Sequence, residues 1–175
     1  MQIRKAVVPG TLLLILALVN WQIAAKERVL RDGELLLLEL APVDPRSLMQ
    51  GDYMQLDYAI ARELSGHADW PRDGQIVVAN DAEGVARLVQ RYESGAPLGA
   101  AEHLLRYRRR SGRIRIGTDA FFFQEGQANR YAGAHYGELR VDAAGESLLI
   151  GLRDRARQPL GALDANANTP PDLPR

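Results

Sequence analysis

The sequence contains no cysteine, and lysine occurs only at Lys5 and Lys26. The absence of cysteine excludes disulfide bonds, thiolate metal sites and a cysteine nucleophile. The scarcity of lysine leaves few candidates for a lysine base, because nearly all the basic side chains are arginine. Redox chemistry through thiols is therefore excluded, and a lysine-dependent mechanism has only two candidate residues.

Neither sign of charge is in excess, since 22 lysine and arginine residues balance 22 aspartate and glutamate residues. The chain offers no overall field for a polyanion, and we predict no nucleic-acid partner. The 3 histidines are dispersed and no metal-binding motif is present, so we predict no metal and no cofactor. At 175 residues, the chain has the length of one domain with appendages.

One long uncharged run, residues 6–25, is the main hydrophobic feature. A helix of about 20 such residues spans the core of a membrane, which is about 30 Å thick. Arg4 and Lys5 precede the run, so we expect a cytoplasmic N-terminus and the remainder of the chain on the other side. Trp21 suits an interfacial anchor, and we predict a transmembrane signal anchor in a single-pass protein.

A cleaved signal peptide is the alternative interpretation, because residues 23–25 offer a marginal small-residue cleavage site. Both interpretations export the rest of the chain. An ordinary buried helix fits less well, because residues 12–19 are apolar on every face.

The exported part divides into a charged connector at residues 26–33, a β-rich domain at residues 34–163, and a tail at residues 164–175. The domain opens on an apolar run, residues 34–43, which is typical of a largely buried strand. The tail lacks apolar periodicity, so we expect it to be disordered.

Three pairs of β-prone segments are each joined by a few turn residues, which predicts three antiparallel hairpins. They pair residues 75–79 with 85–92, residues 103–109 with 113–116, and residues 135–142 with 147–153. A brief helix is predicted at residues 59–64 and a loop at residues 65–74. Many short strands with polar turns predict a mainly β domain, a small antiparallel barrel or sandwich.

Residues 51–58, GDYMQLDY, predict a half-buried strand with one apolar and one more polar face. The apolar face carries Met54, Leu56 and Tyr58, and the other carries Tyr53, Gln55 and Asp57. The segment matches without a gap the signature G-D-Y-x-x-L-x-Y. The chain thus resembles the GDYxxLxY family of uncharacterised bacterial membrane-anchored proteins, and the likeness extends to the N-terminal run, the turn at residues 44–46 and residues 121–142.

That resemblance implies a location in the bacterial inner membrane, with the C-terminal domain in the periplasm. It also implies that a multi-pass inner-membrane protein accompanies the chain as a partner. It supplies no catalytic residue.

The motif offers five candidate site residues: Gly51, Asp52, Tyr53, Leu56 and Tyr58. Gly51 and Asp52 suit a tight turn before the strand, because glycine takes positive φ and aspartate bonds nearby backbone N–H groups. A purely structural role is one interpretation of the motif. The other assigns Tyr53, on the polar face, to a recognition surface, since aromatic residues dominate interface hot spots.

Six arginines between residues 106 and 115 form the one dense basic cluster of the sequence. Alternation along a hairpin places several of them on one face, and we predict a basic surface of Arg106, Arg108, Arg113 and Arg115. A solvated strand face is one interpretation. The other is a surface that docks acidic lipid head groups or an acidic partner, because arginine binds phosphate and carboxylate groups in a planar, bidentate manner.

Residues 121–123 are three successive phenylalanines, and at least two of these rings should belong to the core. Downstream, Glu125, Arg130 and Tyr131 are predicted to line a cleft from their residue types alone.

A serine hydrolase is a further hypothesis, because residues 44–52 loosely resemble type I signal peptidases, with Ser47 before a Gly-Asp turn. Those enzymes use a lysine base, and the exported part offers only Lys26, next to the membrane. His67, His103 and His135 are the alternative bases, but no nucleophile elbow is present. We assign no catalytic residue, and the balance leans away from an enzyme.

Two function hypotheses thus precede the hydrolase. The first is an accessory or interaction module for a multi-pass inner-membrane protein. The second is a periplasmic domain that binds a small ligand in a barrel interior or mouth, near residues 121–131.

Overall fold

A computed structural model of the chain describes residues 2–41, 49–50, 53–67 and 69–161, with side chains at residues 10–41, 53–67 and 69–161. Its helices are α1 (Gln2–Asp32), α3 (Ala59–Ser65) and α4 (Ala128–Tyr131). Its strands are β1 (Glu34–Glu39), β2 (Met49–Gln50), β3 (Tyr53–Gln55), β4 (Asp73–Asn80), β5 (Ala86–Arg91), β6 (Glu102–Arg110), β7 (Arg113–Ile116), β8 (Ala120–Phe122), β9 (Tyr136–Val141) and β10 (Ser147–Arg153). The predicted tail at residues 164–175 and the predicted turn at residues 44–46 lie outside the described residues.

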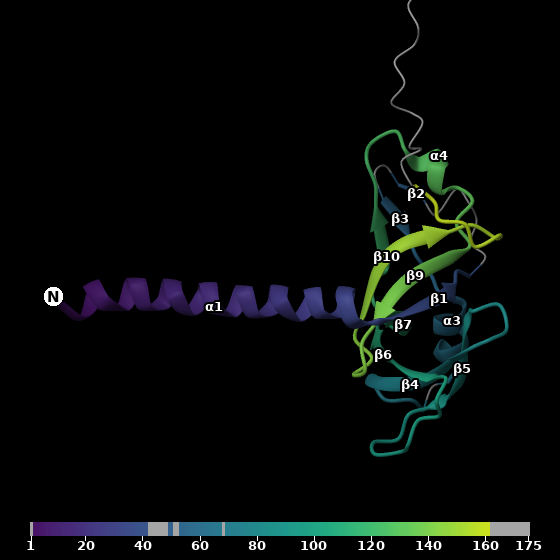
Figure 1. The fold of residues 1–175 in the computed structure, drawn as a ribbon, viewed down its shortest axis with the longest axis horizontal. Helices are drawn as coiled ribbons and strands as arrows, with labels where there is room; N and C mark the ends of the chain where they lie inside the picture. Colours follow the sequence, from purple (N-terminus) through teal and green to yellow (C-terminus); the bar gives the residue numbers. More distant parts are fainter. Residues whose placement is uncertain (1, 42–48, 51–52, 68, 162–175) are drawn as a thin grey trace, which may run out of the picture.

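The described strands form three antiparallel sheets, in the orders β1-β9-β10, β2-β3-β8 and β5-β4-β6-β7 (Figure 1). The three predicted hairpins are confirmed as the pairs β4–β5, β6–β7 and β9–β10. The prediction of a mainly antiparallel β domain is therefore confirmed. Where the sequence predicted a barrel or a sandwich, the structure has three small sheets around a common core.

Aspartate side chains close two of these hairpins. Asp81 Oδ1 accepts hydrogen bonds from the backbone N–H groups of Glu83 and Val85, at 3.0 and 2.8 Å. Asp142 Oδ1 does the same for Ala144 and Glu146, at 3.0 and 2.8 Å. This local turn chemistry explains why the hairpins could be located from sequence.

One hydrophobic core joins the three sheets. Each sheet contributes a residue that is almost completely buried, such as Leu36 on β1, Met54 on β3 and Ile76 on β4. Helix α3 closes the core with Ile60, Ala61 and Leu64. The predicted short helix at residues 59–64 is confirmed and acts as a lid on the sheets.

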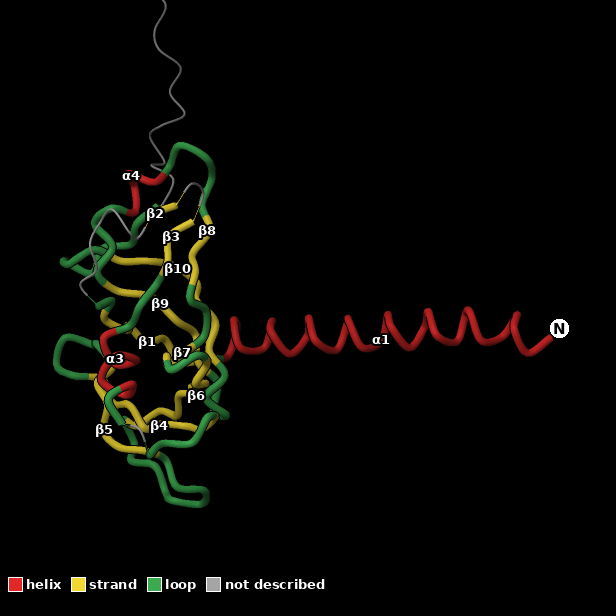
Figure 2. Tube along the Cα trace, turned by 180° about the vertical axis from the view of Figure 1, so that it is seen from behind, coloured by secondary structure: helices red, strands yellow, loops and turns green. Residues whose placement is uncertain are grey.

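Helix α1 projects from the side of the β domain (Figures 1 and 2). Over residues 10–23 every side chain is exposed, including Leu12, Leu13, Leu14, Ile15, Leu16, Leu18, Val19, Trp21 and Ile23. Only the end of the helix packs on the domain, where Val29 is buried and α1 contacts β9 and β10.

The predicted membrane span at residues 6–25 can be compared with the length and apolarity of this helix. No helix in the described part of the chain is both long enough and apolar enough to cross a membrane. The side chains of residues 6–9, where the predicted span begins, lie outside that part. Helix α1 also continues through most of the predicted connector, to Asp32.

The junction between α1 and β1 is built on Gly33. Its N–H donates to the Val29 carbonyl at 3.0 Å, and its own carbonyl accepts from Arg140 Nη1 at 2.7 Å. A Cβ at this position would collide with the Val29 carbonyl oxygen and lie 3.1 Å from both N and O of Val141. All three atoms belong to the backbone, so no side-chain rotation makes room.

We expect Gly33→Ala to lower the free energy of unfolding by about 1–3 kcal/mol, the usual cost of overpacking. Urea denaturation of the full-length chain, followed by tryptophan fluorescence, measures this loss. Gly133→Ala is the matched control, because nothing lies within 4 Å of its Cβ position. Equal midpoints for the two variants would contradict the role assigned to Gly33.

Candidate functional site

The strand that carries the motif turns one face to the core and the other to solvent. Met54, Leu56 and Tyr58 are only 2%, 5% and 2% exposed, as the alternation predicted. Strand β3 pairs with β8, and the Leu56 N–H extends this pairing to the carbonyl of Asp119 at 2.9 Å. Gly51 and Asp52 lie outside the described residues, so their predicted turn stays a prediction.

Tyr58 fills the core directly above Gly137 of β9. A Cβ on Gly137 would lie 2.9 Å from the Tyr58 ring. The ring therefore fits over this position only because glycine has no side chain. The Tyr58 hydroxyl is buried and makes no hydrogen bond within the described structure. Burial, with a smaller contribution from the negative charge of Asp119, raises the pKa of Tyr58 above the ordinary value of 10.0.

The unpaired hydroxyl predicts that Tyr58→Phe keeps or raises the free energy of unfolding at neutral pH, by up to about 1 kcal/mol. The pKa is higher in the folded than in the unfolded chain, so the contribution of the neutral ring is fully present below about pH 10. It is lost as the pH rises further, and Tyr58→Phe should remove this alkaline loss. Urea denaturation across neutral and alkaline pH measures both effects.

Tyr58→Ala provides the comparison, because it deletes the ring and should cost about 3–5 kcal/mol. A loss of more than about 2 kcal/mol in Tyr58→Phe would mean that the hydroxyl has a partner, and the interpretation would be wrong.

The outward face of the same strand carries an aromatic pair, in which Tyr53 is half-buried and Phe122 is exposed. Tyr53 and Phe122 are register partners on β3 and β8, and their ring centroids lie 5.8 Å apart. Phe122 is 73% exposed, more than any other large apolar side chain in the described part of the β domain. Phe121 and Phe123 turn inward instead and pack around Tyr131, with ring centroids 5.0 and 5.3 Å away. Two of the three rings thus join the core, as predicted.

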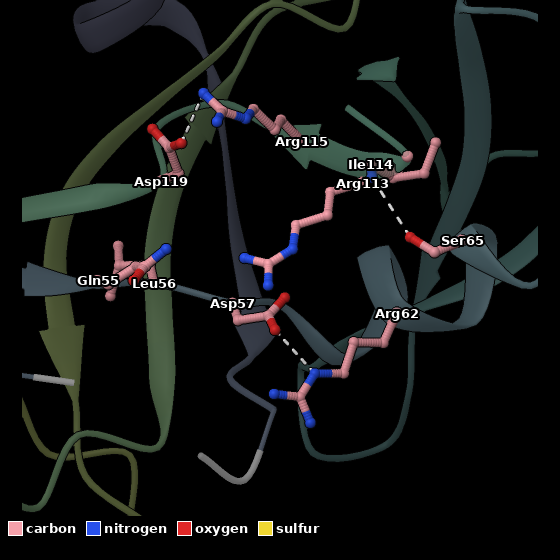
Figure 3. Close-up of a pocket in the computed structure, with 10 residues that line it drawn as sticks. Gln55, Leu56, Asp57, Arg62, Ser65, Arg113, Ile114, Arg115 and Asp119 are labelled. Carbon is pink, nitrogen blue, oxygen red and sulfur yellow. Dashed lines mark hydrogen bonds and ion pairs between the residues drawn. The ribbon is translucent and has the colours of Figure 1, made fainter. Parts of the chain in front are cut away.

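A polar groove continues this outward face beyond Tyr53 (Figure 3). It has a volume of about 550 Å³ and separates the motif segment from α3 and β7. Its principal polar side chains are Gln55, Asp57, Arg62, Arg113, Arg115 and Asp119. The groove therefore brings the family motif and the predicted basic cluster together.

The charges in the groove are only partly neutralised. Arg62 Nε donates to Asp57 Oδ2 at 2.8 Å, and Arg115 Nη1 lies 2.8 Å from Asp119 Oδ2. Arg113 lies between these two pairs, with its guanidinium directed into the groove, and has no ion-pair or hydrogen-bond partner among the described residues (Figure 3). Three arginines against two aspartates leave an excess positive charge, which suits a carboxylate or phosphate group.

The four arginines of the predicted basic surface lie on two paired strands. Arg106 and Arg108 on β6 and Arg113 and Arg115 on β7 are all exposed, and cross-strand register sets Arg108 opposite Arg115. Arg110, opposite Arg113, extends the same face. We call these five residues the arginine face.

The three residues of the predicted cleft differ in their exposure to solvent. Tyr131 belongs to the core and is 9% exposed, whereas Glu125 and Arg130 are exposed. Arg130 Nη1 donates to Gln127 Oε1 at 3.4 Å, within its own helical turn. The ring of Tyr131 thus serves packing, and the cleft stays a prediction.

The residues of the hydrolase hypothesis are only partly described. Ser47 lies outside the described residues. His67 stacks on Trp70, with ring centroids 5.3 Å apart, and His135 lies 3.9 Å from Glu39. Lys26, which is on α1, lies 3.8 Å from Glu146. No catalytic arrangement is built from these contacts.

Three residues of the site lie outside both the motif and the predicted basic surface: Arg62, Asp119 and Phe122. Arg62 comes from α3, directly after the motif, whereas Asp119 comes from the segment before β8 and only the fold brings it to the motif. Phe122 carried a usable signal, because alternation in a run of three phenylalanines turns the middle ring away from its neighbours.

Comparison with known proteins gives one match. A family model described as GDYXXLXY protein matches residues 15–152, which include the motif, the arginine face and most of the described β domain. No curated protein and no solved structure matches the chain.

Proposed function

Because the chain belongs to the GDYxxLxY family, we propose that it is a membrane-anchored interaction module that holds a segment of a partner protein on the outward face of its motif strand. The partner is a multi-pass inner-membrane protein, and the β domain works in the periplasm. The proposal rests above all on one observation, the continuity between the Tyr53–Phe122 pair and the polar groove.

The aromatic pair has the properties of an interface anchor. Phe122 keeps 73% of its surface exposed although it is apolar, and Tyr53 contacts it from the neighbouring strand. Buried aromatic side chains supply much of the energy at protein interfaces. A partner segment that covers Phe122 would remove this apolar surface from water at little cost in ordering, because the strand pairing already holds both rings.

The groove supplies the polar half of the same surface. Gln55 follows Tyr53 by two residues and therefore lies on the same face of β3, at the edge of the groove. The uncompensated guanidinium of Arg113 is directed into that groove. The segment that fits best has an apolar side chain near Phe122 and a carboxylate a few ångströms further along.

The proposed anchor is residues 6–25 of α1. Its described part carries exposed apolar side chains on all sides, from Leu12 to Ile23, and makes no packing contact with the domain before the last turns. A helix that is apolar all round requires an apolar surrounding, and a bilayer supplies one. The anchor would hold the motif strand next to other membrane proteins.

Site-specific photo-cross-linking tests the interaction surface. A photo-reactive residue in place of Gln55 should cross-link the full-length chain, at native expression, to a multi-pass membrane protein. Phe122→Ala should weaken this cross-link by about thirtyfold, the effect of a hot-spot residue worth about 2 kcal/mol. Mass spectrometry of the cross-linked species measures the partner and the yield.

Val89→Ala is the matched control, because Val89 is an apolar side chain of β5 that is 48% exposed. It should leave the yield unchanged. A photo-reactive residue at Ala156, in the turn after β10, should give no such product. Equal yields from Phe122→Ala and Val89→Ala would contradict the proposed surface.

A small acidic ligand is the second candidate, because the groove volume of about 550 Å³ falls within the range of small-molecule sites. Its signature differs from that of a protein partner. Citrate would raise the melting temperature of the wild-type chain but not of Arg113→Ala. The photo-reactive residue in place of Gln55 would yield no cross-linked protein.

A further inference from the structure

The arginine face lies level with the end of the proposed membrane anchor. Lys26 is the first residue after that anchor, and its Nζ lies 3.8 Å from Glu146 Oε2. The other carboxylate oxygen of Glu146 accepts a hydrogen bond from Arg106. A single glutamate thus joins the membrane boundary of α1 to the first arginine of the face.

The backbone strengthens this connection. The Arg106 N–H donates to the Gly145 carbonyl at 2.9 Å, so the turn between β9 and β10 runs along the edge of β6. A Cβ on Gly145 would lie 3.2 Å from backbone atoms of Leu104, Leu105 and Arg106, which shows how closely the two segments approach. The arginine face is therefore held in place beside α1 by strand and turn contacts, not by side chains alone.

The face carries more positive charge than its neighbours neutralise. Arg106 pairs with Glu146, and Arg115 pairs with Asp119. Arg108, Arg110 and Arg113 have no ion-pair partner among the described residues, although Asp73 lies across from Arg108 on β4. These three arginines are exposed along one side of the β6–β7 hairpin.

The strand register makes this charge costly without a counterion. Arg108 is the direct cross-strand neighbour of Arg115, and Arg110 is that of Arg113. Like charges directly opposite one another destabilise a sheet. A hollow of about 240 Å³ offers room for an anionic group between the guanidinium groups of Arg106, Arg108, Arg110 and Arg115, and its lining also includes Asp119 and Ser147.

We propose that the arginine face docks on anionic lipid head groups of the membrane that holds α1. The inference rests on the membrane anchor of the proposed function and adds a second contact between the domain and the bilayer. Phosphate groups satisfy the planar, bidentate donors of arginine, and a surface of many phosphates matches a row of guanidinium groups. The row extends from Arg106 to Arg110, about 13 Å along β6, so docking lays the hairpin along the lipid surface.

The absence of cysteine makes a direct test possible, because one introduced cysteine becomes the sole labelling site. The full-length chain with Ser111→Cys, in the turn between β6 and β7, is labelled with a fluorophore and reconstituted into vesicles that contain a lipid with a nitroxide-bearing head group. The bilayer is either phosphatidylcholine or an equal mixture of phosphatidylcholine and phosphatidylglycerol. Quenching should be several-fold stronger in the mixed bilayer, and high salt should abolish the difference.

Arg108→Gln with Arg110→Gln should return the quenching to the level of pure phosphatidylcholine, since each arginine near an anionic surface contributes about fivefold to the docked population. Neither side chain has an ion pair among the described residues, so the fold should survive. The control removes the same charge elsewhere, by Arg91→Gln with Arg155→Gln. Arg91 lies on β5, where it pairs in register with the buried Ile76. Arg155 lies in the turn after β10, and this turn is on the side of the domain away from α1 (Figures 1 and 2).

The outcomes separate the two proposals. Equal quenching in both bilayers, with the chain floating with the vesicles, would overturn lipid docking and leave the anchor intact. A chain that fails to float with either vesicle would overturn the anchor, and lipid docking with it. If Arg108→Gln with Arg110→Gln abolished the Gln55 cross-link while quenching stayed equal in both bilayers, the arginines would belong to the protein partner and the lipid assignment would be wrong.

Discussion

The two-residue alternation of side chains along residues 53–58 is the constraint on which the rest of the structure depends. It buries Met54, Leu56 and Tyr58 at the point where the sheets meet, and it necessarily turns the residues between them outward. A shift of one residue in the pairing of β3 with β8 would exchange the two faces and empty the core. The core therefore determines where the outward surface lies. The motif leucine and second tyrosine serve packing, while its first tyrosine belongs to the surface that we propose for recognition.

A second constraint sets the domain relative to α1. Gly33 leaves no room for any side chain between helix and sheet, and Val29 is buried at the same junction. Glu146 then contacts both Lys26 and Arg106. Exposed ion pairs of this kind contribute little stability individually, so the close backbone packing at Gly33 is what fixes the direction in which the helix leaves. The charged contacts lie on the side of the domain that adjoins the helix.

The parts of the fold that could be predicted from sequence are those with a local cause. The hairpins follow from alternation and from turns closed by Asp81 and Asp142, and each signal lies within a few residues. The groove has no local cause, although its two ion pairs, Arg62–Asp57 and Arg115–Asp119, each join residues close in sequence, because it forms only where residues 55–65 face residues 112–119. The arginine cluster was visible in sequence, but its position beside α1 depends on Glu146, which lies 40 residues after Arg106 in the β9–β10 hairpin. Long-range contacts of this kind have no signature in periodicity.

The groove and the arginine face share Arg113 and Arg115, and Asp119 lines both the groove and the hollow among the arginines. The ion pair of Arg115 and Asp119 forms one wall of the groove and also one edge of the hollow among the arginines. An anion that draws Arg115 away from Asp119 on one side would leave the carboxylate of Asp119 facing the groove, where it would oppose a second anion. The two sites are therefore not independent: residues in one charge network couple, whereas distant sites add. Lipid docking through Arg108 and Arg110, which do not line the groove, avoids this conflict and leaves Arg113 available to a partner held at the membrane surface.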